Sequence, residues 1–343
     1  METLTKEQEI LTEKPKKPKK KIWISVLTVV LVLAIVLVFA LGNFIFKTTV
    51  LRADGFDSLP PISKLSLEDQ KILDENVEAL KKETEAWLFS SEIEEVEITS
   101  FDGLSLNADV ITPKENKTNL WVVPIHGYHC DREEGKSFGS QYGLKGYNVL
   151  APDLRAHGKS QGNVVGMGWL DRKDILSWID YIISIDSEAK IVLHGLSMGA
   201  STVMMTIGEE ALPKNVVGAV EDCGYTSAWD IFAKELKTSY HVPAVPFLSV
   251  ASSLFSQKGG YNFKEASAVE QIKKTEIPVL FIHGEEDDFV PCEMVHKVFD
   301  ACNSQKQLLI VPKAGHAQSF KLEKDKYFET VFSFLEENCI DKV

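Results

Sequence analysis

The most uniform hydrophobic pattern in the chain is a run of 25 residues without a charged side chain, Ile22 to Phe46. The run follows directly on the lysine-rich segment 14–21. About 20 apolar residues span the hydrocarbon core of a bilayer, whereas the apolar stretch of a secretory signal has only about 7 to 15. The pattern therefore predicts a membrane-spanning signal anchor over 22–46, with a basic N-terminus, residues 1–21, on the cytoplasmic side.

Two alternatives for this run stay open. Ala40 and Gly42 have the spacing that a signal peptidase accepts, so the run could also be a cleaved signal. It could instead be the core helix of a soluble protein, although such a helix is rarely so uniformly apolar or so heavily flanked by lysine. An uncleaved anchor is the expectation, and it places the remaining residues outside the cell membrane.

After the apolar run the periodicity changes twice. Residues 47–65 are mixed and contain Pro60-Pro61, which indicates a connector. Residues 66–90 have apolar side chains at helical spacing behind a potential Ser66 cap, which predicts a juxtamembrane helix. From Glu92 the period is two on both sides of the turn Phe101-Asp102-Gly103, and this pattern is typical of a β-hairpin.

The rest of the chain alternates short apolar runs with helical stretches. This alternation predicts an α/β domain over 92–343 with a mostly parallel sheet of the eight-stranded type, covered by helices on both faces. The stretch 224–275 is too long for a simple crossover and is expected to form a small helical cap over the carboxyl edge of the sheet, where such sheets bind ligands. The runs are 120–125, 147–151, 191–193, 216–220, 279–282 and 308–311.

Charge and cysteine content exclude some classes of function. The net charge is −13, but the first 21 residues carry seven Lys and four Glu, which leaves −16 for the remainder. An acidic body of this kind argues against a nucleic-acid partner, because phosphate binding needs a clustered basic face. The five cysteines form no CxxC pair and no Cys/His cluster, so no metal site is suggested.

One motif carries a candidate nucleophile. Gly195-Leu196-Ser197-Met198-Gly199 lies between an apolar strand-like run and a helix-like stretch. The flanking glycines allow a sharp turn in which the serine hydroxyl is exposed. Ser197 is therefore expected to be a nucleophile, and the backbone N–H of Met198 is expected to bind the oxyanion. A second oxyanion donor is expected at Tyr128, after Gly127.

A serine nucleophile needs a histidine base and an acid that orients it. His316 follows the last short strand and precedes the C-terminal helix, which is the expected place for the base. The acid is expected after the preceding strand, in the run Glu285, Glu286, Asp287 and Asp288, where local composition favours none of the four. Asp222, at the end of another strand, is a further candidate.

These motifs together resemble the α/β-hydrolase superfamily over roughly residues 92–338. His126-Gly127, the segment 153–162, the Ser197 motif, His283-Gly284 to Val290-Pro291, and Gly315-His316 occur in the order of that family. Within it, the chain is similar to bacterial membrane-anchored esterases, monoacylglycerol lipases and serine-aminopeptidase-like hydrolases. The resemblance selects Asp287 as the acid and implies that His126, His157, His194 and His283 are structural or positioning residues.

The function that this resemblance implies is hydrolysis of a carboxylic ester, either a short-chain ester or a monoacylglycerol-like lipid, through Ser197, His316 and Asp287. A serine peptidase or an acyltransferase would use the same three residues. A surface binding protein that retains the fold without turnover is the alternative from another class. No cofactor or metal is expected, and the expected partners are an ester substrate and the membrane.

Overall fold

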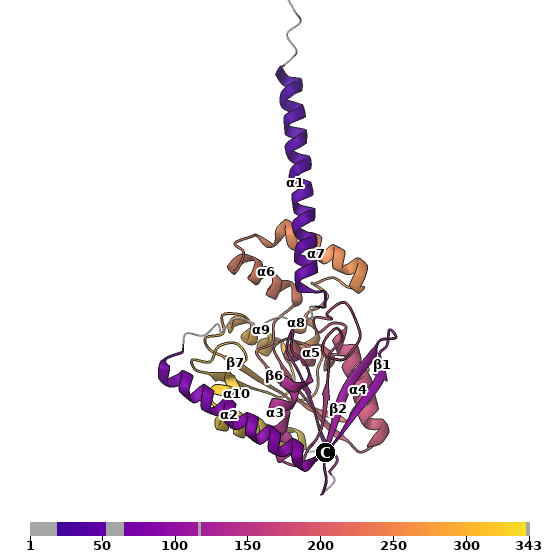
Figure 1. Ribbon diagram of the computed structural model, residues 1–343, viewed down its shortest axis with the longest axis vertical. Coiled ribbons are helices and arrows are strands. Elements are labelled where there is room, and N and C mark those ends of the chain that lie inside the picture. The colour runs from indigo at the N-terminus through magenta and orange to yellow at the C-terminus, as the bar shows by residue number, and fades with distance from the viewer. Residues whose placement is uncertain (1–18, 53–64, 116–117, 341–343) are drawn as a thin grey trace, which may run out of the picture.

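The computed structural model describes residues 19–52, 65–115 and 118–340. Most of the expected basic N-terminus and most of the connector, including Pro60-Pro61, lie outside the described residues. A long N-terminal helix, α1 (Lys19–Thr49), rises from an α/β domain that contains the rest of the described chain (Figure 1).

An eight-stranded sheet forms the centre of this domain, in the order β1-β2-β4-β3-β5-β6-β7-β8. β1 and β2 form the expected antiparallel hairpin, β2 also pairs antiparallel with β4, and the other neighbours are parallel. The expected α/β class and mostly parallel sheet are thereby confirmed. The strands are β1 (Ser91–Thr99), β2 (Ser105–Pro113), β3 (Leu120–Ile125), β4 (Asn148–Pro152), β5 (Lys190–Leu196), β6 (Val216–Asp222), β7 (Val279–Gly284) and β8 (Lys306–Val311).

Helices cover both faces of the sheet, and each face has its own hydrophobic core. The larger core lies on the side of α4, α5, α8 and α9, and the smaller one on the side of α2, α3 and α11. Strands buried on both sides explain the continuous apolar runs in the sequence. The helices are α2 (Leu67–Ser90), α3 (Arg132–Leu144), α4 (Asp171–Ile185), α5 (Met198–Thr206), α6 (Ala228–Thr238), α7 (Ala244–Gly259), α8 (Ala268–Ile272), α9 (Glu293–Ala301), α10 (Ser319–Leu322) and α11 (Lys324–Leu335), followed by a π-helical turn (Glu336–Ile340).

Helix α2 begins directly after Ser66, which caps it. The Ser66 hydroxyl accepts a hydrogen bond from the Asp69 N–H at 3.1 Å, which satisfies one of the free amides of the first turn. Its buried Trp87 packs on α3 so closely that a Cβ at Gly143 would lie 2.0 Å from the indole nitrogen. The helix is therefore held on the domain by a contact that only glycine permits.

The C-terminal end of α1 is packed on the domain. Ile45, Phe46 and Val50 are buried, and the Phe46 ring lies 6.2 Å from the ring of Phe255 in α7. The chain then continues along residues 158–165, where Leu51 forms a bridge with Val164. The helix thus extends past the expected span 22–46, and its last turns belong to the folded domain.

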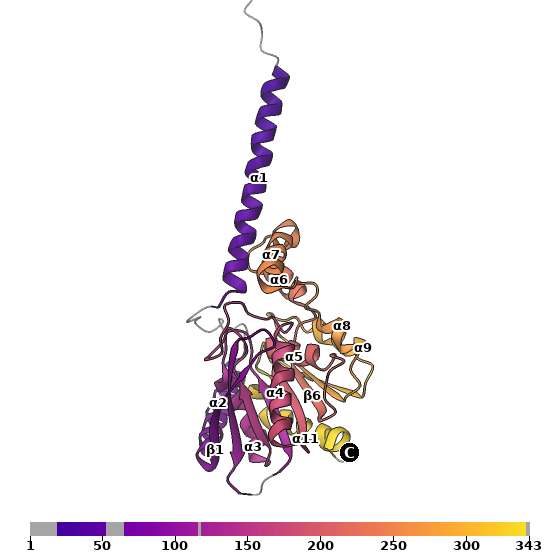
Figure 2. The same cartoon turned by 90° about the vertical axis from the view of Figure 1, so that its right-hand side faces the viewer.

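The segment between β6 and β7 contains α6, α7 and α8, in the region where the sequence predicts a helical cap. Ser227 caps α6 by accepting a hydrogen bond from the Asp230 N–H at 3.0 Å. In two perpendicular views, α6 and α7 stand above the sheet, next to the lower part of α1 (Figures 1 and 2). The cap and the end of α1 therefore share one side of the molecule.

Candidate active site

Ser197 occupies a strained turn between β5 and α5. Its φ is +56° and its ψ is −114°, a conformation that non-glycine residues rarely adopt. A Cβ at Gly195 would lie 2.2 Å from the Gly199 carbonyl oxygen, and one at Gly199 would lie 2.0 Å from the Ile125 oxygen. The glycines of the motif are thus required by close backbone approach, as the sequence predicts. The Ser197 N–H is anchored by the Asp222 carbonyl at 2.8 Å.

Three of the predicted site residues form one chain of hydrogen bonds. The Ser197 hydroxyl donates to Nε2 of His316 at 2.8 Å, and Nδ1 of His316 donates to Oδ2 of Asp287 at 2.7 Å. His316 lies in the turn between β8 and α10, and Asp287 in the turn after β7. Residues that are 119 and 29 positions apart along the chain are brought together at the carboxyl edge of the sheet.

The other acidic candidates are placed differently. Glu285, Glu286 and Asp288 are exposed, whereas Asp287 is buried and its Oδ1 accepts the N–H groups of Phe289 at 2.9 Å and Val290 at 2.8 Å. Among the described residues, Asp222 forms no hydrogen bond with His316; its carboxyl instead accepts one from Ser319 at 3.3 Å. Of these acidic residues, Asp287 is therefore the one that is hydrogen-bonded to His316.

The Asp287 carboxyl is held in its charged form. Burial alone would raise its pKa, but the hydrogen bonds from His283 and His316 outweigh burial and lower the pKa to about 2. His283 Nε2 lies 3.4 Å from Asp287 Oδ2 and 2.8 Å from the Val290 carbonyl oxygen. His283 thus contacts the acid directly, consistent with its expected positioning role.

The two expected oxyanion donors flank Ser197. A Cβ built on Gly127 would lie 3.5 Å from the Ser197 Cβ, so the turn that contains Tyr128 lies against the serine. Among the described residues, neither the Tyr128 N–H nor the Met198 N–H donates a backbone hydrogen bond. Met198 is the first residue of α5, where amide groups have no partner within the helix. Both N–H groups can therefore donate a hydrogen bond to a negatively charged oxygen.

Two histidines hold the turn that carries Tyr128. His126 accepts the Leu154 N–H on Nε2 at 3.0 Å, so its Nδ1 carries the proton and donates to the Gly127 carbonyl at 2.8 Å. His157 accepts the His129 N–H at 3.2 Å. Burial lowers the pKa of His157 to about 3 and keeps it in the neutral form that this contact requires. Both residues act on the backbone of the turn.

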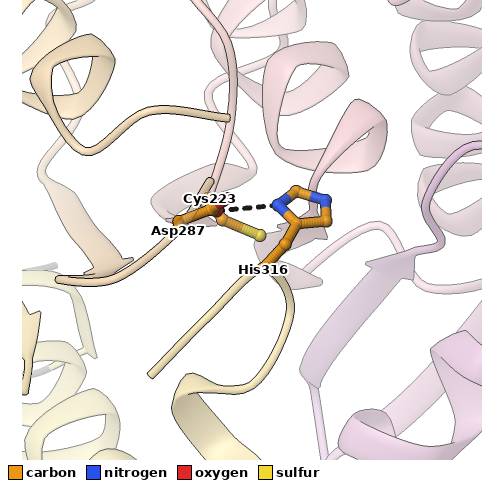
Figure 3. Close-up of side chains that lie close together, drawn as sticks. All are labelled: Cys223, Asp287 and His316. Atoms are coloured by element: carbon orange, nitrogen blue, oxygen red, sulfur yellow. Dashed lines mark hydrogen bonds and ion pairs between the residues drawn. The ribbon is translucent and has the colours of Figure 1, made fainter. Parts of the chain in front are cut away.

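The sequence did not single out Cys223, which lies directly behind the site. Its Sγ, one carboxyl oxygen of Asp287 and one ring nitrogen of His316 lie within 4.8 Å of one another. Figure 3 shows the three side chains close together. His316 Nδ1 already donates to Asp287, and burial raises the pKa of the thiol well above its usual range. A metal ligand must be a thiolate, but this thiol is protonated, and its two neighbours are already hydrogen-bonded to each other. The arrangement is therefore more typical of side chains that line a hydrolytic site than of a metal site.

Glu221, fully buried at the end of β6, gives the domain a measurable pH dependence. Burial raises its pKa to about 8, against about 4.3 in an unfolded chain. As the pH rises, the Glu221 carboxyl therefore loses its proton at a lower pH in the unfolded state than in the folded state. The free energy of unfolding falls between these two pH values, by at most about 1.4 kcal/mol per pH unit.

We therefore expect Glu221→Gln to gain stability relative to the wild type as the pH rises from 5 to 8. Urea unfolding of the full chain in detergent micelles at both pH values measures this. The exposed Glu188→Gln is the matched control. An equal stability difference at both pH values would show that Glu221 is charged in the folded protein.

The sequence matches a known protein family and has relatives among known proteins. Residues 145–341 match the model of the prolyl oligopeptidase family. The chain is 30% identical over 195 residues to the uncharacterized protein YqkD of Bacillus subtilis (strain 168), covering 56% of this chain and 63% of that protein. It is 25% identical over 261 residues to the protein bem46 of Schizosaccharomyces pombe, covering 74% of this chain and 80% of that protein.

Solved structures show the same fold. One is the esterase Pf2001 of Pyrococcus furiosus, with a TM-score of 0.59, 24% identity, and 73% of this chain and 93% of that chain covered. Another is the acylaminoacyl peptidase of Pyrococcus horikoshii, with a TM-score of 0.55 and 18% identity. This match covers 73% of this chain and 42% of that chain. The chain belongs to the prolyl oligopeptidase family and is a serine hydrolase with the α/β-hydrolase fold.

Proposed function

We propose that the protein hydrolyses a carboxylic ester, with Ser197 as nucleophile, His316 as base and Asp287 as the acid that orients it. The observation that carries the proposal is the continuous chain of hydrogen bonds from Ser197 through His316 to Asp287, at 2.8 and 2.7 Å. A carboxylate can only accept from Nδ1, and the Nε2 atom of a neutral imidazole is then the acceptor that proton transfer from the serine requires.

The reaction would proceed in two halves. Ser197 Oγ attacks the acyl carbon while its proton passes to His316 Nε2, and the N–H groups of Tyr128 and Met198 stabilise the oxyanion. The imidazolium returns the proton to the leaving alcohol, which leaves an ester on Ser197. Water then attacks this ester and gives a proton to His316, which passes that proton to Ser197 Oγ as the bond to the acyl carbon breaks and the carboxylic acid is released.

The second candidate is a serine peptidase, favoured by the family to which the chain belongs. Ester hydrolysis is preferred because the match covers 93% of the esterase chain but only 42% of the acylaminoacyl peptidase chain. The peptidase therefore has much structure that this chain does not match. The ester assignment rests on this likeness, whereas the chemistry of the three residues serves both reactions.

We expect the full chain in detergent micelles to cleave p-nitrophenyl esters and to leave aminoacyl p-nitroanilides intact. Both substrates release a chromophore, so one absorbance assay measures the two activities. A fluorophosphonate probe should label the same protein stoichiometrically, because it reports an activated serine without regard to substrate. Cleavage of p-nitroanilides at a kcat/KM similar to that of the esters would favour the peptidase. A folded protein inert to the probe would favour a binding protein.

We also propose that α1 is retained as a membrane anchor, with the hydrolase domain outside the cell membrane. Residues Trp23–Thr49 are long and apolar enough to cross a bilayer. Cleavage near Gly42 would remove a helix that contacts α7, since a Cβ at Gly42 would lie 2.7 Å from Val250. Detection of the intact N-terminus by mass spectrometry of the membrane fraction tests retention, and protease protection of intact cells tests the orientation.

A further inference from the structure

The cap has an exposed apolar loop at its outer end. We call residues 238–247, which comprise the end of α6, the connection to α7 and the first residues of α7, the cap loop. Tyr240 and Val245 are each 65% exposed, Pro243 and Pro246 are exposed, and Phe247 is half-buried. Large apolar side chains gathered in one exposed loop indicate a surface that is covered in the working protein.

The charge around the cap loop is opposite to that of the domain. No aspartate or glutamate occurs in residues 237–264, although 28 residues at the average of 50 acidic residues in 343 would carry about four. The same stretch has three lysines. A basic and apolar segment in an acidic domain fits a bilayer that contains anionic lipid.

The length of α1 determines where the cap lies relative to the hydrocarbon core of the bilayer. Residues 23–40 of α1 are exposed except for the half-buried Val38, and these 18 residues rise about 27 Å. The hydrocarbon core is about 30 Å thick, so a helix that enters it at Trp23 leaves it near Gly42. Gly42 is where α7 contacts α1. A tilt of α1 would only shorten this rise and place the cap deeper.

From these observations we propose that the cap loop inserts into the lipid interface at the membrane surface where α1 emerges. The hydrolase domain then lies flat against the bilayer with its carboxyl edge facing the lipid. Resting on the proposed ester hydrolysis, the inference extends to the substrate: an amphiphilic ester that keeps its acyl chain in the bilayer.

A short path of contacts joins the bilayer to the nucleophile. The Tyr128 hydroxyl donates to the carbonyl of Thr49, the last residue of α1, and Tyr128 follows the glycine that lies against Ser197. Thr49 is seven residues beyond Gly42, about 10 Å along the helix. The oxyanion turn therefore lies just outside the headgroup layer, within reach of an ester at the lipid surface.

A fluorescent probe on the cap loop tests the docking without using activity. We expect Val245→Cys labelled with nitrobenzoxadiazole to shift its emission to the blue in full-chain proteoliposomes of phosphatidylcholine and phosphatidylglycerol. Doxyl-labelled lipids should quench it. The probe requires Cys130→Ser and Cys292→Ser, because these two cysteines are partly exposed. Ile185→Cys, at a 53% exposed position at the end of α4, is the control that should stay in water. Equal spectra at both positions would overturn the proposal.

A charge on the cap loop tests the substrate class. In the same proteoliposomes we expect Val245→Glu to lower hydrolysis of a fluorogenic long-chain monoacylglycerol about tenfold, and hydrolysis of p-nitrophenyl acetate less than twofold. Ile185→Glu should change neither rate. The proposed substrate class would be overturned if Val245→Glu and Tyr240→Glu each lowered the hydrolysis rates of both substrates equally. It would also be overturned if neither variant lowered either rate. A protein that cleaves neither ester would refute the proposed function, while the probe still decides the docking.

Discussion

Ser197→Ala is expected to lower kcat for p-nitrophenyl ester hydrolysis by about 10⁴- to 10⁶-fold, because in the proposed mechanism Ser197 forms the acyl-enzyme. The substitution removes one oxygen from a small turn, and the turn itself is defined by the glycines that flank it. The variant should therefore remain folded, with an unchanged circular dichroism spectrum. A pre-steady-state assay with substrate in excess should show no burst of p-nitrophenol, since no acyl-enzyme accumulates.

The matched control is Ser201→Ala, one turn further along α5. The Ser201 hydroxyl is buried and accepts the Tyr225 N–H at 2.8 Å, so its loss should reduce stability. It is hydrogen-bonded to neither His316 nor Asp287 among the described residues, and fluorophosphonate labelling should persist. Undiminished turnover in Ser197→Ala, or loss of labelling only in Ser201→Ala, would contradict the assignment of the nucleophile.

Much of the fold could be predicted because its strands are short, apolar and regularly spaced. A parallel strand buried on both faces produces a continuous apolar run, and such runs preceded the turns that hold Ser197, Asp287 and His316. The carboxyl ends of parallel strands meet at one edge of the sheet. Candidate residues at the ends of three strands were therefore expected to lie together, as the structure places them.

The choice of the acid could not be made from local composition. Glu285, Glu286, Asp287 and Asp288 are chemically similar and adjacent, and what separates them is direction. Only Asp287 is turned inward, where the N–H groups of Phe289 and Val290 hold one carboxyl oxygen and leave the other for His316. The conformation of the turn determines which of the four side chains points inward. The residue types in the sequence do not indicate that conformation.

The contact between α1 and α7 was equally hidden. A helix face that meets lipid and a helix face that meets another apolar helix have the same composition, so the end of the apolar run gave no sign that Ile45 and Phe46 are buried in the domain. Gly42 is the one local signal, because a small residue allows two helices to approach closely. The sequence thus predicts that the helix is long enough to cross a membrane, but it does not predict which residues of the helix pack on the domain.

Asp287→Asn should lower kcat for ester hydrolysis by about 10⁴-fold while the fold is retained. Oδ1 of Asp287 accepts two backbone N–H groups, so the carbonyl oxygen of an asparagine would stay there and its NH₂ would face His316. An NH₂ group donates, which forces His316 Nδ1 to accept and moves the ring proton to Nε2. That nitrogen could then no longer take the proton of Ser197.

The pH profile and a neighbouring residue separate this account from a general loss of charge. Because the pKa of Asp287 is about 2, the wild-type carboxylate is ionised at every pH used for assay, and the deficit of the variant should be constant between pH 6 and 9. The exposed Asp288→Asn removes the same charge one residue away and should retain activity within about twofold. If Asp222→Asn abolished activity and Asp287→Asn did not, the acid would be Asp222, and the hydrogen bond between Asp287 and His316 would have a structural role only.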